Sequence, residues 1–293
     1  MAEISLEFLR SLLKEDYPDL TITEFQVCKH LILILHNLDM RSSFYTKIWP
    51  ALSSFQNQWD GIKHFAAIPK CYLAKNDCVI LKDLKQYGFV MPDRKQGLTT
   101  EECYVVMKHL SHFHALSLAM KCHNPEAFFE LINEKDGINE GKYLSTPTMC
   151  CQLLYSTLIL YNPDKELYMD KLKQFCAEDV FFKTMVDMVK PREPMAVIGH
   201  GDCWTNNFLF RYAEGEIKNN NMFFVDFQMV RYASPALDLV YIMYLCLDRQ
   251  QRREHQASLL EYYLDNLHAK VEEMSEEDSV FHGAMSREKL RKA

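Results

Sequence analysis

The stretch that decides the fold is Val197–Tyr212, VIGHGDCWTNNFLFRY, together with Met222–Arg231, MFFVDFQMVR. Its two apolar runs, Phe208–Tyr212 and Met222–Val225, lie on either side of the turn-rich segment Ala213–Asn221. Two apolar runs around a polar loop are typical of an antiparallel hairpin. The sequence therefore predicts a hairpin directly after the loop that contains His-Gly-Asp.

The open end of this hairpin brings two oxygen-bearing side chains together. If Tyr212 faces Met222, then Phe208 faces Asp226, and Asn207 lies beside that pair. Mg²⁺ prefers hard oxygen ligands and usually takes only one or two of them from the protein. We therefore expect Asn207 and Asp226 to be magnesium ligands.

Asp202 lies five residues before Asn207. A loop of that length can hold a second carboxylate near the metal without coordinating it, which is where a base for a substrate hydroxyl belongs. The spacing Asp-x-x-x-x-Asn, followed by an Asp at the end of the next strand, is also the arrangement of a kinase catalytic loop. The combination predicts that Asp202 is the catalytic base of a phosphoryl-transfer site.

Other residues of the stretch have plainer interpretations. A single Asp or Asn in a loop is usually a turn or cap residue, and His-Gly-Asp alone is a weak motif, so the functional interpretation depends on the combination. We expect His200 to brace the loop by hydrogen bonds and Asn206 to fix it, and we expect Cys203 and Trp204 to be packing residues.

A helix is expected to start after the hairpin. Ser234 is a good N-cap and Pro235 a good first helical residue. Asp238 then falls in the first turn, where the helix dipole favours a carboxylate, so a structural role is expected for it. Arg231 either reaches a phosphate or pairs with an acid, and the sequence does not separate these alternatives.

Upstream, the chain contains both strand and helix patterns. The predicted strands are Thr21–Val27 and the hairpin of Cys71–Ala74 with Cys78–Leu81, and Leu31–Leu35 is either strand or helix. The predicted helices are Met1–Asp19, Phe44–Phe55 with Pro50 as a stop or kink, and a helix that follows the loop Gly88–Leu98 at the capping box Thr99-x-x-Glu102. On that last helix His114 is expected to be a hydrogen-bonded structural residue. Thr146–Lys190 is mainly helical, and the whole order predicts a two-lobed α+β protein with a largely helical second lobe.

Composition excludes several classes of partner. The 293 residues are 48% hydrophobic and 25% charged, with a net charge of -7. An acidic protein is not attracted to the phosphates of nucleic acids or anionic membranes, and the most apolar run, Leu31–Leu35, is too short to span a bilayer. The ten cysteines include no C-x-x-C pair, so zinc binding is not expected. We expect a cytoplasmic monomer with reduced thiols.

The stretches His200–Asn207 and Val225–Leu239 resemble the insect ecdysteroid kinase-like family, which belongs with the choline kinases and aminoglycoside phosphotransferases. Upstream, Val79–Leu84 resembles the hinge of that family, and Phe113–Ser117 resembles the first large helix of its second lobe. The similarity covers roughly Phe44–Leu264.

This resemblance implies a protein-kinase-like fold, with residues 1–84 as an incomplete N-terminal lobe up to the hinge and residues 85–293 as a helical C-terminal lobe. It implies ATP and Mg²⁺ as cofactors and phosphoryl transfer to a hydroxyl of a small-molecule alcohol, such as an ecdysteroid. By motif match, the base is Asp202, the metal ligands are Asn207 and Asp226, and the adenine meets backbone groups of Lys82, Asp83 and Leu84.

The first lobe departs from the pattern of the family. The family carries a glycine loop and a strand with a phosphate-binding lysine, whereas no glycine precedes Gly61 here, and Lys29 and Lys47 are more typical of solvated surface charges. Arg41 stands where the family has the helix glutamate that pairs with the lysine, and Lys82 stands where the hinge usually has Glu. Because phosphoryl transfer depends on positioned phosphates, we expect weak ATP binding and severely reduced turnover.

Two other hypotheses remain open at the level of sequence. One is a non-catalytic binding protein that keeps a kinase fold, whether it is an evolved pseudokinase or the product of a truncated gene. The other is a metal-dependent phosphoesterase that uses the same Asp and Asn residues, although nothing in the sequence supplies a second full metal cage.

Overall fold

The computed structural model describes residues 31–34, 38–75, 78–133, 170–171, 174–175, 177–213 and 216–275. Helices and small antiparallel sheets are mixed in this part of the chain, which confirms the expected α+β class. The predicted helix Met1–Asp19, the predicted strand Thr21–Val27 and most of the helical region Thr146–Lys190 lie outside the described residues.

The first sheet contains three antiparallel strands in the order β1-β3-β2. Their bounds are Leu31–Ile34 for β1, Cys71–Lys75 for β2 and Cys78–Lys82 for β3. The predicted hairpin is confirmed, and the ambiguous apolar run is a strand. As the central strand, β3 is buried from Cys78 to Leu81, which explains why its sequence is uniformly apolar rather than alternating.

A single helical stretch leads from β1 toward β2 and consists of α3 (Leu38–Ser43), the π-helical turn η1 (Phe44–Ile48) and α4 (Trp49–Gln56). The wide turn closes with a hydrogen bond from the Trp49 N–H to the Phe44 carbonyl. It lies directly before Pro50, which has no N–H to donate. Pro50 therefore does not stop the helix, and the stretch extends to both sides of the predicted Phe44–Phe55.

The second sheet has the order β4-β6-β7, with β4 at Phe89–Val90, β6 at Phe208–Ala213 and β7 at Glu216–Phe224. The predicted hairpin is confirmed as β6 and β7. The expectation that Gly88–Leu98 is entirely loop is wrong, because β4 pairs with β6. A short 3-10 turn, η2 (Lys85–Tyr87), connects the end of the first sheet to β4.

The predicted register of the hairpin is also wrong. Met222 pairs with Phe210 rather than with Tyr212, and Phe208 pairs with Phe224 rather than with Asp226. Glu216–Asn221, part of the segment read as a turn, instead form the first part of β7, and the register shifts between Phe210 and Tyr212. Because β7 already begins at Glu216 and the pairing is irregular, the apolar ends meet two residues away from the predicted pairing.

Most of the remaining elements of the described chain are helices. They are α5 (Thr100–His123), α6 (Pro125–Asn133), α9 (Glu178–Met188), α10 (Ala236–Tyr241), the π-helical turn η4 (Ile242–Cys246) and α11 (Arg249–Glu272). The capping box of α5 is confirmed: the Glu102 N–H donates to the Thr99 hydroxyl over 3.2 Å, and the Thr99 N–H donates to the Glu102 carboxylate over 2.7 Å. Two short strands, β5 (Val197–Gly199) and β8 (Arg231–Ala233), pair with each other.

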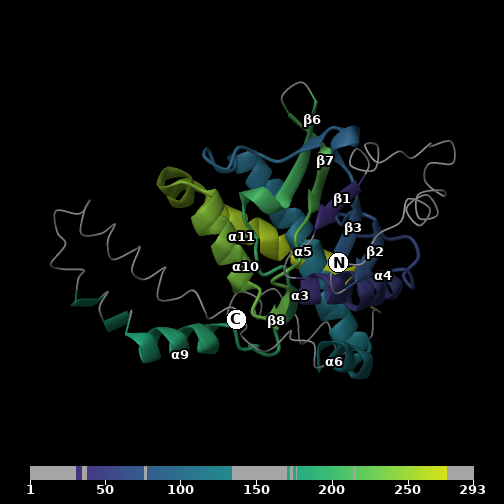
Figure 1. The fold of residues 1–293 in the computed structure, drawn as a ribbon, viewed down its shortest axis with the longest axis horizontal. Coiled ribbons are helices and arrows are strands. Elements are labelled where there is room, and N and C mark those ends of the chain that lie inside the picture. The colour runs from purple at the N-terminus through teal and green to yellow at the C-terminus, as the bar shows by residue number, and fades with distance from the viewer. Residues whose placement is uncertain are drawn as a thin grey trace.

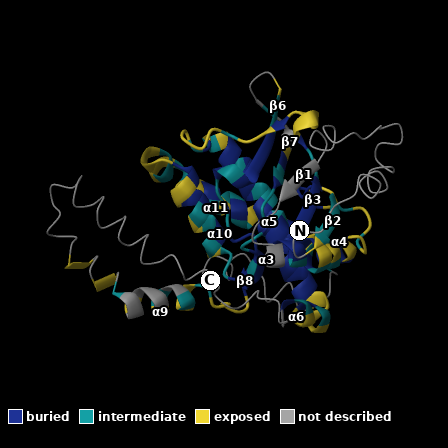
Figure 2. Cartoon of the chain, viewed as in Figure 1, coloured by how far each residue is buried: buried dark blue, intermediate teal, exposed yellow. Residues whose placement is uncertain are grey.

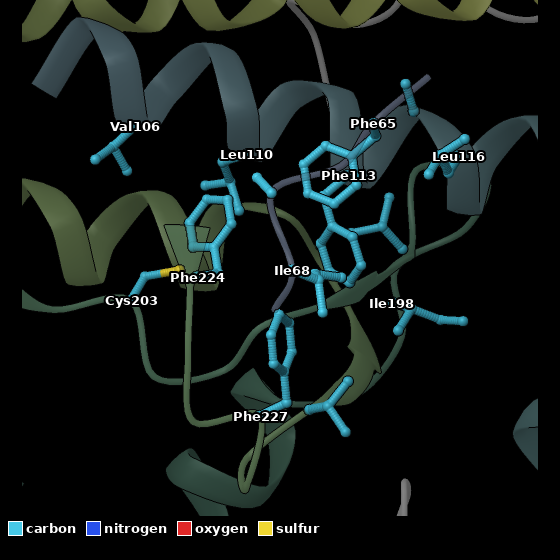
Figure 3. Packing of buried hydrophobic residues seen from close by; sticks show 14 of the residues in the cluster. Phe65, Ile68, Val106, Leu110, Phe113, Leu116, Ile198, Cys203, Phe224 and Phe227 are labelled. Carbon is cyan, nitrogen blue, oxygen red and sulfur yellow. The ribbon is translucent and has the colours of Figure 1, made fainter. Parts of the chain in front are cut away.

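Helix α5 is the centre of this arrangement. Figure 1 shows it with α10 and α11 on one side and the first sheet with α4 on the other, and it packs along α11. Its residues are buried along most of its length (Figure 2). One hydrophobic core joins α5 to the predicted site, as Figure 3 shows for Phe113, Phe224 and Phe227.

Two further observations concern membrane-spanning helices and the cysteines of the described residues. No helix among the described residues is long and apolar enough to cross a membrane. The six cysteines in the described ranges are free thiols, as expected for them.

Candidate active site

The loop that carries His-Gly-Asp is held by one buried carboxylate. Asp238 is 2% exposed and accepts three hydrogen bonds: from the His200 N–H over 2.7 Å, the Gly201 N–H over 2.8 Å and His114 Nε2 over 3.1 Å. Burial by itself would raise the pKa of Asp238, but the hydrogen bonds from His114 and from the Gly201 N–H outweigh it and hold that pKa below its usual value. The predicted structural role of Asp238 is confirmed.

His114 is the structural residue that the sequence predicts. Its Nε2 donates to Asp238, and its Nδ1 accepts a hydrogen bond from the Tyr263 hydroxyl over 2.7 Å. Since Tyr263 lies on α11, His114 connects α5, α11 and the carboxylate beneath the loop.

His200 braces the loop, also as predicted. Its Nδ1 accepts from the Asp202 N–H over 3.2 Å, and its Nε2 donates to the Val225 carbonyl over 3.0 Å. These roles belong to a neutral imidazole, and burial accordingly lowers the pKa of His200. The side chain therefore ties the position of Asp202 to the residue directly before Asp226.

The two glycines on either side of His200 leave no room for a side chain. Gly201 has φ +82°, and a Cβ there would lie 1.8 Å from the Met229 carbonyl oxygen. A Cβ on Gly199 would lie 2.8 Å from Asp238 Oδ2. Close approach of backbone to backbone and to the anchoring carboxylate requires glycine at both positions.

Asn207 and Asp202 are in direct contact. The Asn207 amide nitrogen donates to the Asp202 carboxylate oxygen Oδ2 over 3.0 Å and to the Asp202 carbonyl over 2.9 Å. Asn207 is buried and ends the 3-10 turn η3 (Thr205–Asn207), directly before β6. The amide therefore fixes both the backbone and the carboxylate of Asp202.

The neighbours of these residues behave largely as predicted. Cys203 is buried, and Trp204 packs against the hydrophobic core. Asn206 is half-buried, and its predicted part in fixing the loop stays a prediction.

Main-chain pairing brings Asp226 beside Asn207. The Val225 N–H donates to the Asn207 carbonyl over 3.0 Å, so the hairpin ends where the two predicted metal ligands begin, even though the predicted register is wrong. Asp226 has φ 68°, in the left-handed region that few residues other than glycine occupy. Such strained backbone is concentrated at functional sites.

A side chain from the first half of the chain reaches the same carboxylate. Arg41 Nε donates to Asp226 Oδ1 over 2.7 Å, Arg41 Nη2 lies 2.6 Å from the same oxygen, and Nη2 also donates to Gln228 Oε1 over 2.8 Å. Sequence reasoning noted Arg41 only as a departure from the family and missed this contact. The sole signal was the replacement of an acidic helix residue by a basic one.

The residues predicted to meet adenine lie at the end of β3. The Lys82 N–H donates to the Lys70 carbonyl over 2.9 Å, and the Asp83 carbonyl accepts from the Gln86 side chain over 3.1 Å. Leu84 is buried in a small cluster with Phe89 and Leu209, against which Phe223 and Val225 pack. The structure thus brings this segment against the hairpin that ends at Asn207 and Asp226.

The contacts of Arg231 do not decide whether it reaches a phosphate or pairs with an acid. Its Nε donates to the Met229 carbonyl over 3.2 Å. It also lies near Tyr241, whose pKa is raised by burial and, more weakly, by Asp202, while Arg231 opposes the shift.

The donor set at the hairpin suits a hard cation. Asn207 and Asp226 offer an amide and a carboxylate group, and Mg²⁺ takes few protein ligands of this kind. Among the described residues, no group of three or more His, Cys, Asp or Glu side chains could hold a metal ion. The site contains a candidate base, Asp202, and two candidate metal ligands, Asn207 and Asp226. The basic side chain of Arg41 contacts Asp226.

A model of the ecdysteroid kinase-like family matches residues 40–276 of the chain. The chain is also 22% identical over 219 residues to the Caenorhabditis elegans protein "Uncharacterized oxidoreductase dhs-27", and this match covers 70% of the chain and 25% of that protein. The chain thus spans about a quarter of the length of this relative.

Two solved structures are similar to this one. The Plasmodium vivax ethanolamine kinase Pv091845 is 12% identical, with 99% of this chain and 95% of that chain covered and a TM-score of 0.40. The GDP and kanamycin complex of APH(2")-IIia is 11% identical, with 92% and 97% covered and a TM-score of 0.44.

Proposed function

Because the chain belongs to the ecdysteroid kinase-like family, we propose that it is a phosphotransferase that uses ATP and Mg²⁺ and acts on a hydroxyl of a small molecule, such as an ecdysteroid. The observation that carries this proposal is the direct contact of Asn207 with both the carboxylate and the carbonyl of Asp202. It places the candidate base beside a candidate metal ligand, and a kinase catalytic loop carries the same two kinds of residue.

Asp202 is the proposed base. The Asn207 amide binds its Oδ2, and the His200 ring accepts its N–H, so both the carboxylate and the backbone of Asp202 are oriented before a substrate arrives. A positioned carboxylate can accept the proton of an alcohol as it attacks a phosphoryl group. Pre-orientation of this kind is the main contribution a protein makes to phosphoryl transfer.

Asn207 and Asp226 are the proposed magnesium ligands. The main-chain bond from the Val225 N–H to the Asn207 carbonyl keeps the two residues adjacent. When bound, Mg²⁺ supplies positive charge that offsets the charge developing on the phosphate oxygens.

Backbone groups of Lys82, Asp83 and Leu84 are the proposed adenine contact. Burial of Leu84 with Leu209 holds this segment against the hairpin, which supports a nucleotide that extends from the hinge to the metal ligands. We place the division between the lobes at this hinge, after residue 84, and we propose a cytoplasmic monomer.

A second candidate function is binding without catalysis. It is favoured by the contact of Arg41 with Asp226 and by the absence of any glycine before Gly61 in the sequence. Both features predict weak nucleotide binding and low turnover, because they affect the positioning of the phosphates rather than the base.

Labelled ATP and a panel of small-molecule alcohols, steroid alcohols included, test the proposal with the purified chain. Asp202→Asn should lower the rate of transfer about 10²- to 10⁴-fold, the typical contribution of a positioned base, and should leave nucleotide binding by calorimetry unchanged. Asp187→Asn, at an exposed acid on α9, is the matched control and should have no effect. Transfer that survives Asp202→Asn would exclude this base, and nucleotide binding with no transfer to any alcohol would favour the second function.

A further inference from the structure

The Arg41–Asp226 ion pair has no role in the proposed phosphoryl transfer. The side chains of Arg41 and Asp226 are 9% and 25% exposed. Solvent therefore weakens this ion pair less than it would weaken a fully exposed one. Two nitrogens of the guanidinium lie against a single carboxylate oxygen, Oδ1. Charge-assisted contacts of this kind are stronger than neutral hydrogen bonds and depend on geometry.

Aromatic packing fixes the helix that carries Arg41. The ring of Phe44 stacks on Phe227 with centroids 3.7 Å apart and an interplanar angle of 3°. Tyr45 meets the same ring edge-on, at 6.2 Å. Because residues three and four apart lie on one helix face, Phe44 and Tyr45 hold the face of Arg41 against the segment that starts at Asp226.

Phe227 is itself fixed from the other side. The His200 ring lies 4.5 Å from its centroid, and Phe227 is fully buried. This packing places Arg41 against Asp226. Gln228 provides a second acceptor, for Nη2 of the guanidinium. These contacts hold the Arg41–Asp226 pair within packed side chains rather than on the protein surface.

A further polar group lies at the same place. The Tyr45 hydroxyl is buried and has no hydrogen-bond partner among the described residues. Burial is the main cause that raises its pKa, and nearby Cys71 and Asp226 add to the shift. Its environment therefore includes the same carboxylate that Arg41 binds.

We propose that Arg41 is the residue that determines cation binding at Asp226, by acting as a built-in positive charge that competes with a divalent cation. This inference rests on the proposed function only in taking Asp226 as a metal ligand. The guanidinium already neutralises the carboxylate and occupies Oδ1, so a cation must either displace it or bind beside a like charge. Both alternatives weaken divalent binding.

Titration of the full chain with Mn²⁺ alone, followed by electron paramagnetic resonance, tests this inference without any catalytic readout. Arg41→Met keeps an unbranched apolar stem but removes the guanidinium and its charge, and it should raise Mn²⁺ affinity at least about tenfold. Arg41→Lys keeps the charge but not the forked contact, and it should give a smaller increase. Adding Asp226→Asn to Arg41→Met should abolish the gain.

Each outcome of this titration decides the inference. Equal Mn²⁺ affinity in wild type and Arg41→Met, weaker binding in the variant, or no binding by either protein overturns it. If Arg41→Met fails to fold, as judged by its melting curve, Arg41→Lys alone decides, since an unchanged Mn²⁺ affinity in that variant also overturns the inference. Failure of the proposed function would leave the wild type without phosphoryl transfer while the Mn²⁺ result still stands, so the two failures are distinguishable.

Discussion

Replacing Asp238 by Ala should strongly destabilise the loop that carries Asp202 and the fold around it. The carboxylate accepts hydrogen bonds from the His200 and Gly201 backbones and from the His114 ring, and all three donors are buried. After the substitution all three donors lose the acceptor that holds them in the folded protein. The effect should therefore be far larger than that of an average substitution.

The number of donors sets the magnitude. Each buried donor left without an acceptor costs about 1–3 kcal/mol, and water that enters the space left by the carboxylate keeps each cost near the low end. Three donors then give a loss of about 3–5 kcal/mol. A domain of ordinary stability has only about 5–15 kcal/mol in total, so Asp238→Ala should lose a large share of its stability.

Asp238→Asn should be intermediate. The amide oxygen retains one acceptor, and the amide nitrogen can donate to His114 if that ring changes tautomer and donates to Tyr263 instead. The His200 N–H cannot change its role, so about 1–3 kcal/mol should be lost for that one donor. The order of stability should be wild type, then Asn, then Ala.

Urea unfolding followed by circular dichroism measures these differences. Asp187→Ala, at an exposed acid in surface ion pairs with Lys190 and Arg192, is the control and should change the unfolding free energy little. Because the folded pKa of Asp238 lies below its usual value of 3.8, its ionised form stabilises the fold above that value, and this contribution is lost as the pH falls through the folded pKa. The wild type should therefore approach the stability of Asp238→Asn in strong acid. A loss below about 1 kcal/mol for Asp238→Ala at neutral pH would refute the reasoning.

Two further substitutions test the same structure. Gly201→Ala places a Cβ 1.8 Å from the Met229 carbonyl oxygen at φ +82°, and it should cost about 3 kcal/mol or more; a melting temperature equal to that of the wild type would show that the loop adapts freely. Burial, followed by Lys270 and other nearby basic groups, lowers the pKa of His112 from 6.5 to about 3. As the pH falls below 6.5, the unfolded chain then binds a proton that the folded chain refuses, and stability declines. His112→Gln should remove about 1–2 kcal/mol of the decline between pH 7 and pH 5 in urea titrations, and parallel curves for the two proteins would contradict this cause.

The sequence predicted the parts of the site that lie close together along the chain. Asp202 and Asn207 are separated by a short loop, so their proximity followed from spacing, whereas the hydrogen bonds between them were not predicted. The brace formed by His200 and the structural role of Asp238 followed from residue type and local pattern. The structural role of His114 followed from its place on a predicted helix, although its partner Asp238 lies 124 positions away.

Strand register was harder to predict. Lys218 and the three asparagines of Asn219–Asn221 have low strand propensity, yet they lie within β7 because pairing with β6 continues beyond the apolar residues. The irregularity after Phe210 then changes which residues face each other. Register depends on such long-range pairing and on bulges, which composition does not reveal.

The partner of Arg41 could not be predicted, since 185 positions separate it from Asp226. A basic residue on an amphipathic helix is usually a solvated surface charge. Here the stacking of Phe44 on Phe227 holds the helix so that Arg41 contacts Asp226. Aromatic stacking between distant segments leaves no periodic signal in a sequence. The replacement of an acidic residue was visible, but its consequence was not.

The two halves of the site therefore have different structural origins, and this separates their expected responses to mutation. Asp202 is oriented by Asn207 and His200, and its loop is anchored by Asp238, all from one continuous part of the chain. Asp226 depends on two distant parts of the chain. Its backbone follows the hairpin, whereas its carboxylate is held by Arg41 on a helix. Changes in the helix that carries Arg41 should then alter cation binding and leave the geometry of the base intact. Mutations in that helix should consequently affect cation binding at Asp226 more than the orientation of Asp202, although Asn207 still links the two through its contact with Asp202.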